Sequence, residues 1–223
     1  MQSWSGPVAD APADVPLVAS ETTFRGGIWD VRSDTIDFAG QRIVRDVMIH
    51  PGAVGIIALD EADRVLLIRQ YRHPVGMYLF EPPAGVLDKP DEDPLGAAQR
   101  ELAEEAGLAA DTWDVLVDFA NSPGGSSETL RCYLARGLHE LPDGRVHTGE
   151  AEEQDLPQAW VPLDEARDAV LAGDLANPTT VMGVLAAWCS RAEGWRSLRS
   201  AQTPWPLRAH VVDSGRCRPV LRR

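Results

Sequence analysis

Four charged residues stand close together near the middle of the chain: Arg100, Glu101, Glu104 and Glu105. Residues three and four apart share one face of an α-helix, so a helix here would place the three glutamates in one acidic stripe beside the arginine. Three like charges repel one another, and the stripe therefore requires a compensating positive charge. Because carboxylate oxygens on a rigid element suit hard cations, the spacing predicts a site for a divalent ion such as Mg²⁺.

The flanking residues predict where this helix begins and ends. Asp93 and Pro94 combine an N-cap side chain with a proline at the first helical position, and Gly107 is a typical C-terminal stop. Between them, apolar residues recur at spacings of three and four and would face the core: Leu95, Ala98, Leu102 and Ala106.

Two arginines and a proline-rich turn precede the helix. Arg69 and Arg72 end an apolar segment beside a loop, which makes a reasonable anion site. Two solvated surface arginines are the alternative, and only the nearness of the acidic helix favours the anion site. Pro82, Pro83 and Gly85 force an irregular turn, whose carbonyl groups could point inward as ligands.

Composition narrows the class of protein. The formal net charge of −13 disfavours nucleic acid or an anionic membrane surface as the main partner. The three cysteines are widely spaced and form no metal-ligand pair, which indicates a reduced compartment. No apolar run approaches the ~20 residues that cross a bilayer, and no signal pattern opens the chain. We therefore expect a cytoplasmic protein.

Four regions follow one another along the chain. Residues 1–16 read as a flexible leader. Residues 17–50 offer short strands and read as a small antiparallel sheet that a partner chain could cover. Residues 51–190 form the main domain, and residues 191–223 form a basic C-terminal extension. The strands expected in residues 17–50 are Val18–Phe24, Ile28–Val31, Thr35–Phe38 and Ile43–Ile49, with a turn at Ser33 and Asp34.

The main domain alternates strands, helices and two polar loops. Residues 53–59 and 65–70 read as a hairpin, and residues 77–81, 113–120, 129–135 and 159–163 as further strands. Helices are expected at 164–172 and 179–191. The loop at 121–128 either closes over a ligand or simply joins two strands. A second loop, residues 142–155, is strongly acidic.

The C-terminal extension holds eight arginines against Glu193 and Asp213, with Trp205 among several prolines. Contact with RNA or with an acidic partner is one interpretation. We favour a poorly ordered extension that folds back on the acidic body.

The acidic stripe and its flanks resemble the Nudix box, G-x5-E-x7-R-E-U-x-E-E-x-G-U, where U is aliphatic. The matching positions are Gly85, Glu92, Arg100, Glu101, Leu102, Glu104, Glu105, Gly107 and Leu108. Six residues, rather than five, separate Gly85 from Glu92, and the extra residue falls in the loop before the helix. The spacing from Glu92 onward is intact, so this departure leaves the metal ligands in register.

Within the family, the chain is most similar to ADP-ribose pyrophosphatases over roughly residues 18–190. Further matches are Arg69–Arg72, Glu81, Pro83–Gly85, Ser122–Gly124 and Trp160–Leu163. The resemblance implies an α/β fold, a Nudix-type α/β/α sandwich around a mixed sheet with a small N-terminal antiparallel sheet. It also implies a homodimer in which that sheet is exchanged between subunits.

The chemistry implied by the resemblance is Mg²⁺-assisted hydrolysis of ADP-ribose to AMP and ribose 5-phosphate, with Mn²⁺ as an alternative metal. Glu101 and Glu105 would be the main metal ligands, with Glu104 close by and the Ala84 carbonyl completing the shell. Arg100 would orient the glutamates. Other nucleoside diphosphate sugars are alternative substrates, and a non-catalytic module that senses ADP-ribose is a further alternative.

Similar enzymes take their general base from a later acidic loop, which here points to Glu152 or Glu153, with Glu128 as a third candidate. The resemblance leaves the choice among these glutamates open. Substrate contacts are expected from Arg45, Arg69, Glu81 and Glu128. Phe24 or Trp29 could stack on the adenine across a dimer, although ordinary packing is the simpler interpretation of those two aromatic residues.

Overall fold

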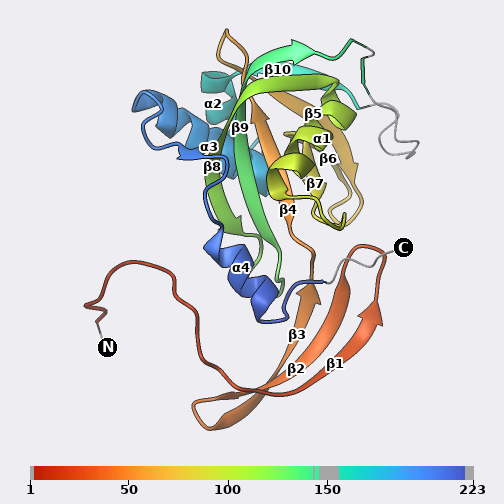
Figure 1. Ribbon diagram of the computed structural model, residues 1–223, viewed down its shortest axis with the longest axis vertical. Coiled ribbons are helices and arrows are strands. Elements are labelled where there is room, and N and C mark those ends of the chain that lie inside the picture. Colours follow the sequence, from red (N-terminus) through yellow and green to blue (C-terminus); the bar gives the residue numbers. More distant parts are fainter. Residues whose placement is uncertain (1–2, 143, 146–155, 219–223) are drawn as a thin grey trace.

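The structure is a computed structural model that describes residues 3–142, 144–145 and 156–218. It has a main domain and, below it in Figure 1, a separate N-terminal sheet. That sheet is antiparallel in the order β1-β2-β3, with β1 at Leu17–Arg25, β2 at Asp30–Phe38 and β3 at Gln41–Ile49. Its exposed apolar side chains include Leu17, Val18, Phe24, Phe38 and Val44.

The expected turn at Ser33 and Asp34 is wrong, because one continuous strand, β2, replaces the two short strands predicted there. Asp34 is a typical turn residue, but its carboxylate accepts hydrogen bonds from Ser20 Oγ at 2.6 Å and from Arg32 Nη2 at 2.8 Å. These bonds within the sheet hold an unfavourable residue in an extended conformation.

The main domain contains a five-stranded mixed sheet and a three-stranded sheet. The larger sheet has the order β11-β8-β9-β4-β7, in which only the β4 and β9 pair is parallel. Its strands are β4 Ala53–Ala58, β7 Ala84–Val86, β8 Leu108–Ala120, β9 Thr129–Glu140 and β11 Arg199–Ser200. The antiparallel sheet β10-β5-β6 comprises Gln158–Pro162, Arg64–Arg72 and Met77–Glu81.

The predicted hairpin of residues 53–59 and 65–70 is wrong. β4 pairs with β9 along one edge and with β7 along the other, so it has no edge left for β5. A single isolated bridge between Leu59 and Val65 marks where the chain leaves one sheet for the other.

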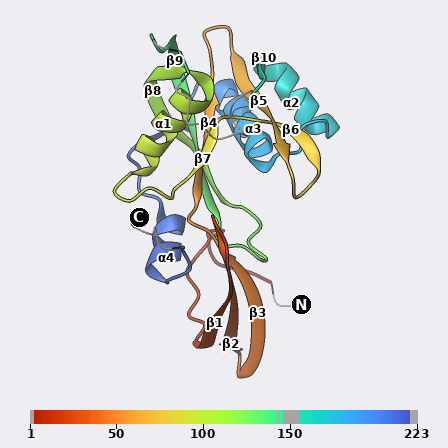
Figure 2. The same ribbon diagram turned by 90° about the vertical axis from the view of Figure 1, so that its right-hand side faces the viewer.

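Helices cover both faces of the mixed sheet, which confirms the predicted α/β/α arrangement (Figure 2). α1, Pro94–Ala106, lies on one side, whereas α2, Leu163–Ala172, and α3, Pro178–Ala192, lie on the other. β4 is buried throughout because its side chains alternate between two cores. Val54 and Ile56 pack in the core that includes Leu102 of α1, and Ile57 packs in the core that includes Val184 of α3.

The expectation of a poorly ordered C-terminal extension is wrong for the described part of this segment. After α3, the chain adds strand β11 to the mixed sheet and then forms α4, Pro206–Asp213. Trp205, at the start of α4, belongs to the core and is 8% exposed. Arg199 donates to Asp118 Oδ2 at 2.9 Å, so part of the basic charge is paired with β8. In the described part of the chain, no helix is both long enough and apolar enough to cross a membrane.

The junction between the N-terminal sheet and the main domain is built around His50. Its Nδ1 accepts a hydrogen bond from the Gly52 amide at 3.1 Å, and its Nε2 lies 3.8 Å from Glu128 Oε1. Burial lowers the pKa of His50, and the attraction of Glu128 only partly offsets that effect. Two nearby guanidinium groups, those of Arg208 and Arg218, lower this pKa further.

We expect His50 to make the folded protein less stable as the pH falls below about 6.5. In the unfolded chain this side chain takes up a proton near that pH, whereas in the folded protein its lowered pKa resists protonation. The unfolded state then binds more protons, so acid favours unfolding by at most about 1.4 kcal/mol per pH unit for this one group. Urea titrations at about pH 7.5, 6.5 and 5.5 measure the slope.

His50→Asn is the informative variant, because its amide oxygen can still accept from Gly52 while the titration is removed. Its free energy of unfolding should depend less on pH than that of the wild type. His139→Asn, at an exposed position on β9, serves as the matched control. Equal pH slopes for wild type and His50→Asn would contradict the assignment.

Candidate active site

The acidic stripe stands on α1, whose ends are the predicted ones. Asp93 Oδ1 accepts a hydrogen bond from the Gly96 amide at 2.7 Å, which satisfies one of the free donors of the first turn. Gly107 ends the helix with φ +70°, a left-handed conformation that glycine adopts without strain. Ala98 and Leu102 are fully buried, so packing fixes the opposite face of the helix.

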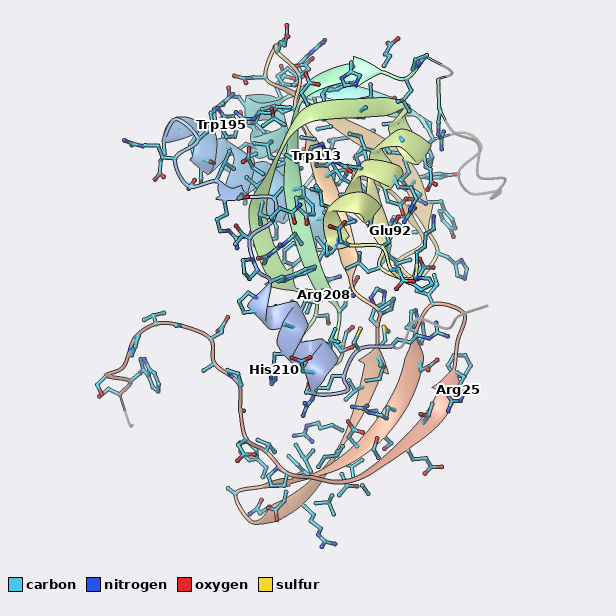
Figure 3. All side chains as sticks on the ribbon, in the orientation of Figure 1. Arg25, Glu92, Trp113, Trp195, Arg208 and His210 are labelled. Carbon is cyan, nitrogen blue, oxygen red and sulfur yellow. The ribbon has the colours of Figure 1, made fainter. Side chains whose placement is uncertain are left out.

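Arg100 connects three of the carboxylates. Its Nε and Nη2 donate to the two oxygens of Glu92 at 2.8 and 2.9 Å. Nη1 donates to Glu101 Oε1 at 2.6 Å and to Glu104 Oε2 at 2.8 Å. The hydrogen bonds from Arg100 lower the pKa of Glu92, and those to Glu92 raise the pKa of Arg100. Figure 3 places Glu92 in the loop that leads into α1. The arginine thus holds several carboxylates in fixed positions.

Glu101 and Glu105 lie deeper, at 8% and 7% exposure. Glu105 Oε2 accepts a hydrogen bond from the Ala84 amide at 2.9 Å, which joins α1 to β7. At Gly85, any Cβ would overlap the Glu101 side chain. The glycine of the box is therefore needed for close approach, and the strand brings the Ala84 backbone beside the acidic face.

The oxygen atoms of this face are suitable ligands for a divalent cation, although the described side chains do not form a complete coordination site by themselves. Within residues 3–142, 144–145 and 156–218, no three acidic, histidine or cysteine side chains are gathered closely enough to hold a metal by themselves. Arg100 Nη1 is shared by Glu101 and Glu104, so the arginine lies among the carboxylates. All candidate ligands are nevertheless hard oxygens, and a bound cation would offset the cost of burying Glu101 and Glu105.

Two of the expected substrate contacts lie on the small sheet β10-β5-β6. Glu81 is 4% exposed and receives two hydrogen bonds from Arg72 Nε, at 2.9 and 3.1 Å. Arg69 is exposed, and its guanidinium lies 4.2 Å from the centre of the Tyr78 ring. Sequence reasoning identified both arginines but did not pair Arg72 with Glu81, because the two side chains meet only when β5 and β6 form a hairpin.

The other two expected contacts lie elsewhere. Arg45 is an exposed residue of β3 in the N-terminal sheet, and its guanidinium donates to the Val44 carbonyl at 2.8 Å. Glu128 accepts a hydrogen bond from Asn121 Nδ2 at 2.7 Å and faces His50 at the junction. These contacts link Arg45 to its own strand and Glu128 to the junction around His50.

The structure also describes the loop at residues 121–128 and the two aromatic residues that were considered for stacking on the adenine. The loop joins β8 to β9 and docks on β3, since Met48 donates to the Gly125 carbonyl at 2.9 Å. Phe24 and Trp29 pack on each other with ring centres 6.2 Å apart. Glu152 and Glu153, the first two candidates for the general base, lie outside the described residues.

Comparison with known proteins gives consistent results. The family model described as "NUDIX domain" matches residues 49–180. An ADP-ribose pyrophosphatase of Mycobacterium tuberculosis is 41% identical over 196 residues, which cover 87% of this chain and 93% of the relative. A methanol dehydrogenase activator of Bacillus methanolicus is 32% identical over 168 residues, covering 75% and 89%. A crystal structure of an ADP compounds hydrolase superposes with a TM-score of 0.69 at 24% identity, covering 84% of this chain and all of that one.

Proposed function

Since this chain belongs to the Nudix family, we propose that it hydrolyses the pyrophosphate bond of ADP-ribose, giving AMP and ribose 5-phosphate. The observation that carries this proposal is the buried acidic face of α1, organised by Arg100 and closed by β7. The similarity to an ADP-ribose pyrophosphatase supports this choice of substrate. The proposal places the enzyme in the cytoplasm.

The metal would be Mg²⁺, with Mn²⁺ as an alternative, held by Glu101 and Glu105 with support from Glu104 and the Ala84 carbonyl. When bound, such an ion neutralises the charge of the diphosphate and lowers the pKa of a bound water. Arg100 fixes the direction of the Glu101 and Glu104 carboxylates, so that ligand geometry does not have to be assembled for each turnover. The Ala84 amide does the same for Glu105.

The general base would be Glu152 or Glu153. Glu128 is the less favoured candidate, because Asn121 and the docked loop hold it beside His50. A base must reach the attacking water through one hydrogen bond, so its position matters more than its residue type.

Substrate recognition would involve Arg69 and Glu81, together with Arg45 and Glu128. Arg69 would contact phosphate and Glu81 would accept a hydrogen bond from the sugar or adenine, with Arg72 fixing its carboxylate. Arg45 lies on the N-terminal sheet and would act on the site of a partner subunit. The exposed apolar side chains of that sheet support a homodimer with exchanged sheets, which sedimentation at micromolar concentration would test.

A substrate panel tests the activity. We expect Mg²⁺-dependent release of AMP from ADP-ribose, with kcat/KM at least about tenfold above the values for ADP-glucose, GDP-mannose and NADH. Chelation by EDTA should abolish turnover, and added Mg²⁺ or Mn²⁺ should restore it. A higher kcat/KM for another compound of the panel would move the assignment to that nucleoside diphosphate derivative. Binding of ADP-ribose without metal-dependent turnover would instead indicate a sensing module.

A further inference from the structure

The covalent link between the N-terminal sheet and the main domain is short. β3 ends at Ile49 and β4 begins at Ala53, so residues 50–52 join them. Gly52 in this link has φ +89°, a left-handed conformation that glycine adopts without strain. A short link of this kind does not fix the direction of a sheet by itself, because a few dihedral angles can absorb a hinge motion. Contacts from other segments must therefore hold the sheet in place.

The loop at residues 121–128 makes the first of these contacts. The Met48 amide donates to the Gly125 carbonyl at 2.9 Å, and the Ser127 amide donates to the Met48 carbonyl at 2.9 Å. The Ser127 hydroxyl also accepts a hydrogen bond from the His50 amide at 3.0 Å. Because the loop joins β8 to β9, these bonds attach the end of β3 to the main domain.

The second contact comes from residues 214–218, which follow α4 and which we call the strap. Arg218 of the strap donates to the carbonyls of Gly26 and Gly27, in the turn between β1 and β2. Its Nε also lies 3.6 Å from Asp30 Oδ1, and the two side chains are 15% and 14% exposed. Partial burial limits the screening of this ion pair by water and salt, so Arg218 binds the turn with charge as well as with hydrogen bonds.

Two further bonds join the strap to the sheet and to the link. Arg32 Nη1, on β2, donates to the Gly215 carbonyl at 2.9 Å. The Arg218 amide donates to the His50 carbonyl at 3.3 Å. The loop thus binds β3, whereas the strap binds β2 and the β1–β2 turn. Together they hold the N-terminal sheet at different strands.

The strap is anchored to the main domain through α4. Trp205, at the start of that helix, is 8% exposed and packs in the core. Arg208 of α4 donates to the Pro51 carbonyl, and a Cβ at Gly52 would overlap its guanidinium. Figures 1 and 2 show α4 beside the junction, and Figure 3 places Arg208 at the same level. The chain before the strap is therefore fixed to the core, while the strap itself binds the sheet.

We propose that the strap holds the N-terminal sheet in one orientation on the main domain, acting jointly with the loop at residues 121–128. Both contacts must open before the sheet can swing away, so each makes the opening of the other more costly. Such a coupling is reciprocal. Arg45 lies on this sheet, so the strap also limits where that side chain can reach. The inference does not depend on the proposed function, because it concerns the placement of the sheet and not the reaction.

Amide hydrogen exchange of the full chain tests the strap. Arg218→Met removes the side-chain bonds to the β1–β2 turn and leaves the bonds of the loop intact. We expect the Met48 and Ser127 amides to exchange at least about tenfold faster in this variant, because opening then breaks one contact instead of two. If Arg218 had only a local role, exchange at these two amides would equal that of the wild type, and this result would overturn the proposal.

Ser127→Ala supplies the reciprocal measurement, because it removes the acceptor of the His50 amide in the loop. The Arg218 amide, which bonds the His50 carbonyl in the strap, should then exchange faster, and unchanged exchange there would also contradict the joint action. Arg216→Met is the matched control. Among the described residues, no side-chain hydrogen bond or ion pair involves Arg216, so exchange at Met48 should stay at the wild-type rate.

Thermal unfolding identifies any variant that fails to fold. In that case Arg218→Lys takes the place of Arg218→Met, since lysine keeps the charge beside Asp30 but lacks the planar group that reaches two carbonyls at once. Faster exchange at Met48 and Ser127 in a folded Arg218→Lys supports the strap, and wild-type exchange in it overturns the strap. Neither measurement requires a substrate, so a chain without turnover on ADP-ribose would overturn the proposed function alone.

Discussion

Replacing Glu105 by Gln is expected to lower kcat for ADP-ribose by about a hundredfold or more, with little change in stability. Glu105 is buried, and one of its oxygens accepts the Ala84 amide at 2.9 Å. Glutamine keeps the size of the side chain and can still accept that bond, but it removes the negative charge that a divalent cation requires. The measurement is AMP release at saturating Mg²⁺, together with the midpoint of thermal unfolding.

Glu165→Gln, at an exposed position on α2, is the matched control and should retain full activity. The Glu105→Gln variant should also need a higher Mg²⁺ concentration for half-activation, since a ligand has been neutralised. Comparable turnover in this variant and the wild type would exclude Glu105 from the metal site. A lost activity that coincides with a large fall in the unfolding midpoint would show a structural role for Glu105 instead.

The helix that carries the site could be predicted from sequence because its determinants are local. Asp93 and Gly107 mark the two ends of the helix that carries the acidic stripe. The spacing of Ala98 and Leu102 identifies its buried face. Each of these signals depends on helix geometry alone. The same holds for the acidic stripe, whose residues share a face in any α-helix.

The pairings between distant segments could not be predicted in the same way. The apolar sequence of β4 is compatible with a hairpin with β5 and also with a central strand of a sheet. The pairing of β4 with β9 along one edge and with β7 along the other makes it a central strand. Asp34 favours a turn locally, but a hydrogen bond from another strand overrides that preference. Arg145 and Gln158 carry no local sign that both donate to the end of α1.

The C-terminal extension shows how composition can mislead. Its many arginines and prolines indicated poor order, because such residues bury little apolar area. In the structure, two of these arginines donate to backbone carbonyl groups near the N-terminal sheet: Arg208 to Pro51, and Arg218 to Gly26 and Gly27. The segment therefore connects the junction to the N-terminal sheet. Besides strand β11, Trp205 attaches the segment to the main domain, because its ring packs in the core next to a buried arginine of β9.

That arginine, Arg131, is 3% exposed and is the centre of the attachment. It donates to both oxygens of Asp118, at 2.7 and 3.0 Å, and to the Thr203 and Pro204 carbonyls at 2.7 and 3.2 Å. Its guanidinium also lies 4.9 Å from the centre of the Trp205 ring. One side chain thus satisfies a carboxylate of β8 and two carbonyls of the C-terminal segment at once.

We therefore expect Arg131→Met to reduce the free energy of unfolding by about 3 kcal/mol, because methionine fills part of the volume but leaves buried acceptors without this donor. Urea unfolding gives the free energy, and amide hydrogen exchange in α4 should rise because its attachment is weakened. Arg136→Met is the matched control: its partner Asp114 also lies on β8, but the Arg136 side chain is 33% exposed, so its loss should cost less than about 1 kcal/mol. Equal losses in the two variants would show that the C-terminal segment is held by the apolar contacts of Trp205 rather than by Arg131.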